Sequence, residues 1–127
     1  MPPKRIIVVE DDDTIRDLYV EILTEEGYEA IPACNGREAI EILKNSTLPA
    51  LMLTDFLMPD MNGAEMIDRL MRENRLNFPV LMVSATLSAI KVNGQEIDVL
   101  RKPMNVEELL HRVHKHCGPS LVNRTMQ

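Results

Sequence analysis

Residues 50–63 read ALMLTDFLMPDMNG, an apolar run followed by one carboxylate and then a loop of turn-forming residues. The apolar run Leu51–Thr54 has the length and composition of a buried strand, which places Asp55 at its carboxyl end. The proline, asparagine and glycine behind it are typical of loops. The stretch therefore predicts a strand that delivers a single carboxylate to the edge of a buried sheet.

A second apolar strand, residues 6–9, runs directly into four consecutive carboxylates, Glu10-Asp11-Asp12-Asp13. A nucleotide-binding fold would carry a glycine-rich turn here, because its backbone N–H groups must approach phosphate. Four carboxylates repel phosphate unless a divalent cation lies between them. If the two strands belong to one parallel sheet, their carboxyl ends meet at the same edge and form a cation site.

The chemistry of these groups predicts a magnesium site built from oxygen ligands. Asp11 and Asp55 are the expected direct ligands, and Glu10 is expected to bind directly or through water. The backbone carbonyl of Leu57 would be the last metal ligand that the protein supplies. Mn²⁺ would be able to replace Mg²⁺. A cation beside Asp55 would make that carboxylate a phosphoryl acceptor.

Strand-like and helix-like segments alternate from end to end of the 127 residues, which predicts an α/β domain. We expect a three-layer sandwich, with a five-stranded parallel sheet and helices on both faces. The stretch Thr86–Glu96 is poorly periodic and contains Gly94, so the fourth helix is expected to be short or irregular. Residues 1–118 would form the domain, and residues 119–127 a C-terminal tail or the start of a linker. The strands are expected at residues 6–9, 29–33, 51–54, 80–83 and 97–100.

Two further polar side chains fall at predicted strand ends: Ser84 after the fourth strand and Lys102 after the fifth. The Lys102 ammonium can neutralise charge on a phosphoryl group, and the Ser84 hydroxyl can donate a hydrogen bond to it. Taken alone, Ser84 would satisfy a backbone group and Lys102-Pro103 would be a plain loop. Four functional groups at one sheet edge favour the catalytic interpretation of all of them.

In combination these residues resemble the receiver domain of bacterial two-component response regulators. The resemblance runs from about Lys4 to Gly118, and the segments that carry it are Val9-Glu10-Asp11-Asp12, Asp55 with residues 58–63, Ser84-Ala85 and Lys102-Pro103. It implies a flavodoxin-like fold and a signalling domain, not an enzyme, that catalyses only its own phosphorylation and dephosphorylation. Asp55 would take its phosphoryl group from a sensor histidine kinase, a histidine phosphotransfer protein or a small phosphodonor. The resemblance also implies a cis peptide bond between Lys102 and Pro103.

The chain departs from the family pattern at three places. Glu10 stands where the first acidic residue is often Asp, and Val99 stands where a Tyr or Phe usually precedes the lysine by three residues. The fourth-helix region between Ser84 and Lys102 is also short. These departures keep open a second reading, in which the chain is a receiver-like interaction module with an atypical or phosphorylation-independent output.

Composition limits the remaining alternatives. A net charge of −6 argues against nucleic-acid binding by this chain, and no apolar run is long enough for a membrane span. Two cysteines outside any metal spacing fit a cytoplasmic protein. The output partner or fused output domain is unknown, and dimerisation is left open.

A phosphohydrolase with an Asp nucleophile would carry a second Asp two residues later, where this chain has Leu57. His111, His114 and His116 are interpreted as surface residues of the last helix, without an acidic partner from another motif.

Overall fold

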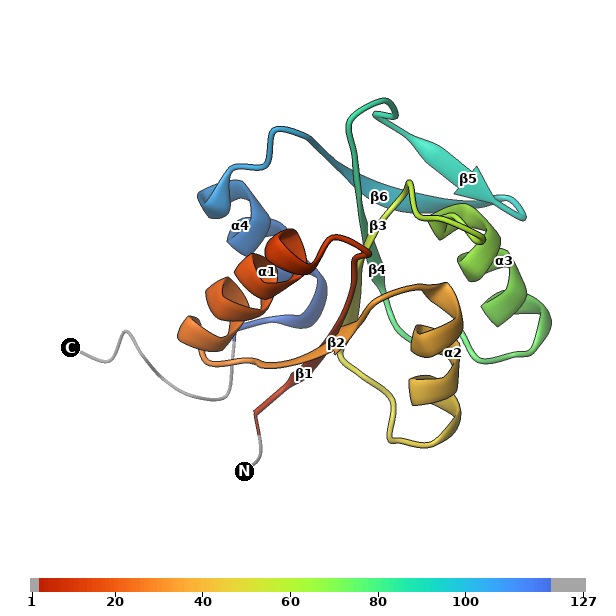
Figure 1. The fold of residues 1–127 in the computed structure, drawn as a ribbon, viewed down its shortest axis with the longest axis horizontal. Coiled ribbons are helices and arrows are strands. Elements are labelled where there is room, and N and C mark those ends of the chain that lie inside the picture. The colour runs from red at the N-terminus through yellow and green to blue at the C-terminus, as the bar shows by residue number, and fades with distance from the viewer. Residues whose placement is uncertain (1–2, 120–127) are drawn as a thin grey trace.

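In the computed structural model, which describes residues 3–119, four helices cover the two faces of a six-stranded sheet (Figure 1). Helices α1 and α4 lie on one face, and α2 and α3 lie on the other. The strands are β1 (Arg5–Val9), β2 (Glu29–Ala33), β3 (Leu51–Asp55), β4 (Val80–Ser84), β5 (Ile90–Val92) and β6 (Gln95–Arg101). The helices are α1 (Asp13–Glu25), α2 (Gly36–Lys44), α3 (Gly63–Arg72) and α4 (Val106–Cys117).

The strand order is β2-β1-β3-β4-β6-β5, and the first five of these strands run parallel. Alternate side chains of the central strands enter two separate cores. In β1, Ile7 and Val9 pack toward α2 and α3, whereas Ile6 and Val8 pack toward α1 and α4. Burial on both faces explains why these strands are continuous apolar runs. The predicted α/β sandwich is therefore confirmed.

The segment between β4 and β6 differs from the expectation. Within the described residues it contains no helix, and the sheet has six strands where five were predicted, because β5 pairs antiparallel with β6. Asn93 and Gly94 both have positive φ, 51° and 81°, and connect the two strands as a two-residue turn. An Asn-Gly pair flanked by strand-forming residues is a strong hairpin signal in sequence. The interpretation of Gly94 as a helix breaker missed it.

Gly63, the first residue of α3, lies so close to the end of β3 that a side chain does not fit. A Cβ at this position would lie 2.8 Å from the backbone oxygen of Asp55 and 3.0 Å from Cε of Met82. We expect Gly63→Ala to lower the free energy of unfolding by about 2 kcal/mol, because the backbone must shift. Urea denaturation measures this loss. Gly36→Ala is the matched control, since its Cβ would meet the flexible Met61 side chain, at 2.9 Å from Sδ. An equal loss in both variants would contradict this explanation.

The C-terminal end of the described chain follows α4 closely. Gly118 ends the helix with a φ of 75°, and its N–H donates to the backbone oxygen of His114 at 2.7 Å. Residues 120–127 of the predicted tail lie outside the described residues, so the domain boundary at residue 118 stays a prediction. No helix in the stretch 3–119 combines the length and the apolar character that crossing a membrane requires.

Candidate phosphoacceptor and metal site

Four neighbouring strands, β1, β3, β4 and β6, end at one edge of the sheet and bring their following residues together. Asp55, the last residue of β3, lies opposite Val83 of β4, and Ser84 follows directly. The backbone N–H of Lys102, just beyond β6, donates to the backbone oxygen of Ser84 at 2.9 Å. The parallel register therefore places the acidic turn, Asp55, Ser84 and Lys102 along a common edge, as the sequence predicted.

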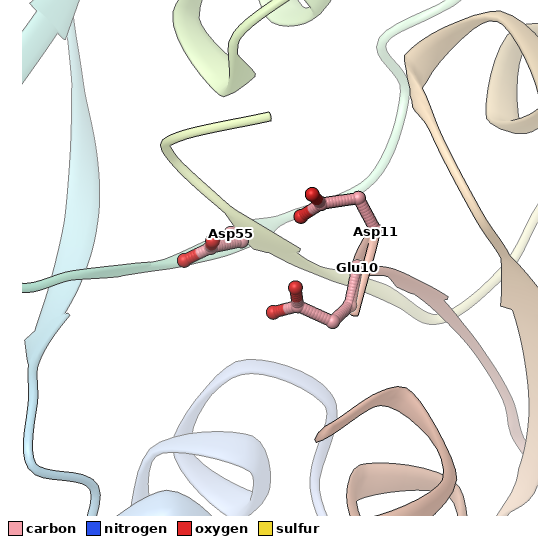
Figure 2. A group of neighbouring side chains, drawn as sticks. All are labelled: Glu10, Asp11 and Asp55. Atoms are coloured by element: carbon pink, nitrogen blue, oxygen red, sulfur yellow. The ribbon is translucent and has the colours of Figure 1, made fainter. Parts of the chain in front are cut away.

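Three carboxylates form a cluster at the ends of β1 and β3 (Figure 2). Glu10, Asp11 and Asp55 each contribute one carboxylate oxygen, and these oxygens all lie within 4.8 Å of one another. Asp11 is exposed, whereas Glu10 and Asp55 are buried. Three acidic groups at this separation repel one another, so the cluster favours a bound proton or a divalent cation.

Glu10 is the member of this cluster that most needs a cation. Its side chain is 2% exposed, and one oxygen, Oε2, accepts a hydrogen bond from the backbone N–H of Asp12 at 3.0 Å. The other oxygen, Oε1, is buried without a partner among the described residues. Burial, with a smaller contribution from Asp55, raises the pKa of Glu10 from 4.5 to about 7. A buried carboxylate that has one orphaned oxygen and belongs to a cluster with two further carboxylates fits a hard cation such as Mg²⁺.

The four acids of the turn divide into two functional pairs. Asp12 is the N-cap of α1, and its side chain accepts from the backbone N–H of Ile15 at 3.0 Å. Asp13 pairs with Arg16, which also donates to the backbone oxygen of Glu10 at 2.8 Å. Glu10 and Asp11 therefore belong to the carboxylate cluster, while Asp12 and Asp13 support the helix that holds the turn.

Asp55 forms an ion pair with the side chain of Lys102. Its Oδ1 lies 3.1 Å from Nζ of Lys102, and the Asp55 side chain is 7% exposed. Burial raises the pKa of Asp55, and the ammonium of Lys102 opposes this change. The peptide bond between Lys102 and Pro103 is cis, as the resemblance implied. Asp55 thus contacts a lysine ammonium and lies close to two further carboxylates.

Ser84 is buried at the end of β4, with an exposed fraction of 2%. Its hydroxyl oxygen accepts from the backbone N–H groups of Thr86 at 3.1 Å and Leu87 at 2.9 Å. The hydroxyl therefore organises the turn that leaves β4. It also lies 3.4 Å from the hydroxyl oxygen of Thr86, a contact in which either hydroxyl can donate.

Leu57 lies two residues beyond Asp55 in the loop between β3 and α3, and its side chain is 61% exposed. The structure adds nothing on its carbonyl as a ligand, so that assignment stays a prediction. Val99, at the position where the family usually has an aromatic residue, is buried in the core on the α3 side of the sheet.

The interpretation of the histidines was incomplete. Nε2 of His116 lies 2.9 Å from Asp98 of β6, and Nε2 of His114 lies 3.6 Å from Glu26. Arg112 also binds Asp98, at 2.6 Å. These contacts join α4 to β6 and to the end of α1, and a sequence pattern confined to α4 could not reveal them.

The geometry supports phosphoryl transfer to a carboxylate. A buried Asp lies beside a lysine and next to two further carboxylates suited to a hard cation, and the neighbouring strand ends at a buried serine. The cation and the ammonium would neutralise the charge of an incoming phosphoryl group. The resulting arrangement has an acceptor, a cation site and two groups for phosphoryl oxygens at one sheet edge.

Comparisons with known proteins agree with this geometry. The family described as response regulator receiver domain matches residues 6–114. A probable transcriptional regulatory protein of Picosynechococcus is 38% identical over 118 residues, and the alkaline phosphatase synthesis regulator PhoP of Bacillus subtilis is 34% identical over 114 residues. The matches cover 85% and 87% of this chain but only 47% of each relative, so the chain spans about half the length of these relatives. The response regulator TrrA of Thermotoga maritima, solved with Mg²⁺ and BeF, is 31% identical with a TM-score of 0.76, over 88% of this chain and 97% of that one. The chain therefore belongs to the response regulator receiver domain family, whose standard role is to accept a phosphoryl group in two-component signalling.

Proposed function

We propose that Asp55 is the phosphoacceptor of this receiver domain and that Asp11, Asp55 and Glu10 hold the required Mg²⁺. The observation that carries the proposal is the position of Asp55, which is buried, belongs to the carboxylate cluster and forms an ion pair with the ammonium of Lys102. Mg²⁺ is the metal that the family uses, and the solved relative TrrA contains Mg²⁺ together with BeF. The backbone carbonyl of Leu57 is proposed as a further ligand.

In the proposed reaction, a carboxylate oxygen of Asp55 attacks the phosphorus of a phosphohistidine. The new O–P bond forms as the N–P bond breaks, and the imidazole leaves with the electron pair of that bond. Mg²⁺ held by Glu10, Asp11 and Asp55 would supply positive charge where the phosphoryl group enters. Asp55 needs no general base, since its ionised form is itself the nucleophile.

Lys102 and Ser84 would receive the phosphoryl oxygens that the metal does not contact. The ammonium of Lys102 lies within salt-bridge distance of Asp55 and can move to a phosphoryl oxygen on its flexible stem. The Ser84 hydroxyl oxygen accepts from the turn behind it, and its O–H group can donate to another phosphoryl oxygen once the side chain turns toward it. Both groups would stabilise the transferred phosphoryl group and would not act as acid or base.

We place the reaction in the cytoplasm, which fits the free cysteines Cys34 and Cys117. The proposed phosphodonor is a sensor histidine kinase, a phosphotransfer protein or a small phosphodonor. Residues 1–118 would act as the receiver domain, and residues 119–127 as a tail or the start of a linker. Because the relatives at twice this length are transcriptional regulators, a fused output domain is the proposed recipient of the signal.

Incubation with acetyl phosphate tests the proposed function directly. In the presence of Mg²⁺, intact-protein mass spectrometry should show one added phosphoryl group per chain. Removal of the metal with a chelator should abolish the mass increase, because the carboxylate cluster would then repel the donor. Equal phosphorylation with and without the metal would contradict the assigned role of Glu10, Asp11 and Asp55.

Lys102→Ala should slow phosphorylation by roughly 10²-fold, since it removes one preorganised charge from the transferring group. Mg²⁺ binding should persist, because the lysine is not a ligand. The rate of the mass increase with acetyl phosphate measures the first effect, and stabilisation of the protein by Mg²⁺ measures the second. Lys91→Ala, at an exposed position of β5, is the matched control. A similar phosphorylation rate for the two variants would show that Lys102 takes no part in phosphoryl transfer.

A further inference from the structure

We infer that phosphorylation is transmitted through the turn held by Ser84 to the β5–β6 hairpin, and from the hairpin to α3. This route rests on the proposed phosphorylation of Asp55. The elements that would respond to it are the turn after β4, the β5–β6 hairpin and α3. The segment that replaces the expected fourth helix, residues 85–94, connects them. Val99 is a small buried side chain, so the chain has no aromatic ring at this position that could transmit the signal by moving.

The first step is the turn that follows β4. The buried hydroxyl oxygen of Ser84 accepts hydrogen bonds from the N–H groups of Thr86 and Leu87. The same hydroxyl would donate to the phosphoryl group on Asp55. If Ser84 turns toward that group, it either carries the two N–H groups with it or loses both hydrogen bonds. In both cases the backbone of residues 85–87 must rearrange.

The second step joins this turn to α3 through the hairpin. Only two residues separate Leu87 from β5, and Val92 of β5 packs in the same core as the buried side chains of α3. At the tip, Nδ2 of Asn93 donates to Oδ1 of Asp68 at 2.7 Å and lies 3.5 Å from Sδ of Met71. A shift of the hairpin would therefore move its tip against two residues of α3.

The base of the hairpin has room for such a shift. A pocket of about 550 Å³ that opens to solvent is lined by both arms, residues 88–91 and 96–99, and by Lys115 and His116 of α4. Strand β5 is three residues long, and its partner β6 is the only strand with which it pairs among the described residues. A segment that borders solvent can shift with less resistance than one enclosed in a filled core. The hairpin is thus anchored at its tip and borders an open pocket at its base.

Nuclear magnetic resonance of the ¹⁵N-labelled chain with Mg²⁺ and beryllofluoride tests this route. A ¹⁹F resonance of bound beryllofluoride reports occupancy of Asp55 independently. We expect larger amide shifts at Thr86, Leu87, residues 90–95 and α3 than at Glu29–Ile31. The last segment is a matched reference, because it lies at the amino end of the parallel strands, as the hairpin tip does. If beryllofluoride binds and the hairpin shifts no more than Glu29–Ile31, the route is wrong and the proposed function stands. Without a bound ¹⁹F signal, the proposed function fails, and the route fails with it.

Two pairs of variants test the separate steps. Ser84→Ala should suppress the hairpin shifts in protein that has bound beryllofluoride, and Ser84→Thr should retain them because the hydroxyl is kept. Asp68→Ala should suppress the shifts of α3 and leave those of residues 86–87. Its control is Arg72→Ala, which removes the 2.8 Å ion pair of Asp68 but not the contact with Asn93. Unchanged shifts in Ser84→Ala would overturn the first step, and unchanged α3 shifts in Asp68→Ala would overturn the second.

Discussion

Asp55→Asn is expected to abolish phosphorylation by acetyl phosphate or by a cognate kinase. An amide lacks the charged oxygen nucleophile, so the loss should be on the order of 10³-fold or more. The substitution preserves the size of the side chain and removes one of three mutually repelling carboxylates, so the variant should remain folded. Intact-protein mass spectrometry measures the effect.

Asp60→Asn is the matched control for this experiment. Asp60 lies in the same loop beyond β3, is exposed, and has a positive φ of 70°, which asparagine adopts readily. This variant should gain a phosphoryl group as the wild type does. An undiminished mass increase in Asp55→Asn, or its loss only in Asp60→Asn, would show that the acceptor is a different residue.

Glu10→Gln is expected to stabilise the metal-free protein at neutral and higher pH. The pKa of Glu10 is about 7 in the folded protein and about 4.5 in the unfolded chain, so the folded state binds the proton more tightly. The wild type therefore loses stability as the pH rises from 4.5 to 7, by about 3 kcal/mol from this group. Glutamine does not titrate and escapes this loss. Below pH 4.5 the advantage of the variant should disappear.

Urea denaturation at several pH values, with and without Mg²⁺, measures both parts of this prediction. Mg²⁺ should stabilise the wild type above pH 7, because the cation takes the place of the proton, and should stabilise Glu10→Gln much less. Asp12→Asn is the control, since asparagine is an equally good N-cap and Asp12 lies outside the carboxylate cluster. A stability difference between wild type and Glu10→Gln that stays constant with pH would refute the explanation.

Much of the site could be predicted because its chemistry lies at strand ends. Apolar runs identify buried parallel strands, and parallel strands necessarily bring their carboxyl ends to the same edge. Glu10, Asp55, Ser84 and Lys102 each follow or end such a run, so their meeting follows from the chain pattern. Glu10 and Asp11 were assigned to the cation site from the sequence, but the choice of Asp12 over Asp13 as the N-cap of α1 did not follow, because the two residues are chemically identical.

The hairpin was missed for a different reason. A strand of three residues, Ile90–Val92, is too short to show a periodic pattern, and its pairing with β6 depends on contacts that form only in the folded chain. The Asn93-Gly94 turn was the local signal that predicts it. The contacts of His116 and Arg112 with Asp98 were likewise invisible in the sequence, since they join α4 to a strand that is distant along the chain.

The sequence alone determined the α/β alternation, the parallel direction of the five main strands and the set of residues at their carboxyl ends. These features depend on periodic burial and on local turn chemistry, which are properties of short segments. Only the tertiary structure decided that one Glu10 oxygen is buried without a partner among residues 3–119, that Asp12 caps α1, and that a hairpin contacts α3 through Asn93. Those features depend on which distant groups exclude water from one another, and no single segment contains that information.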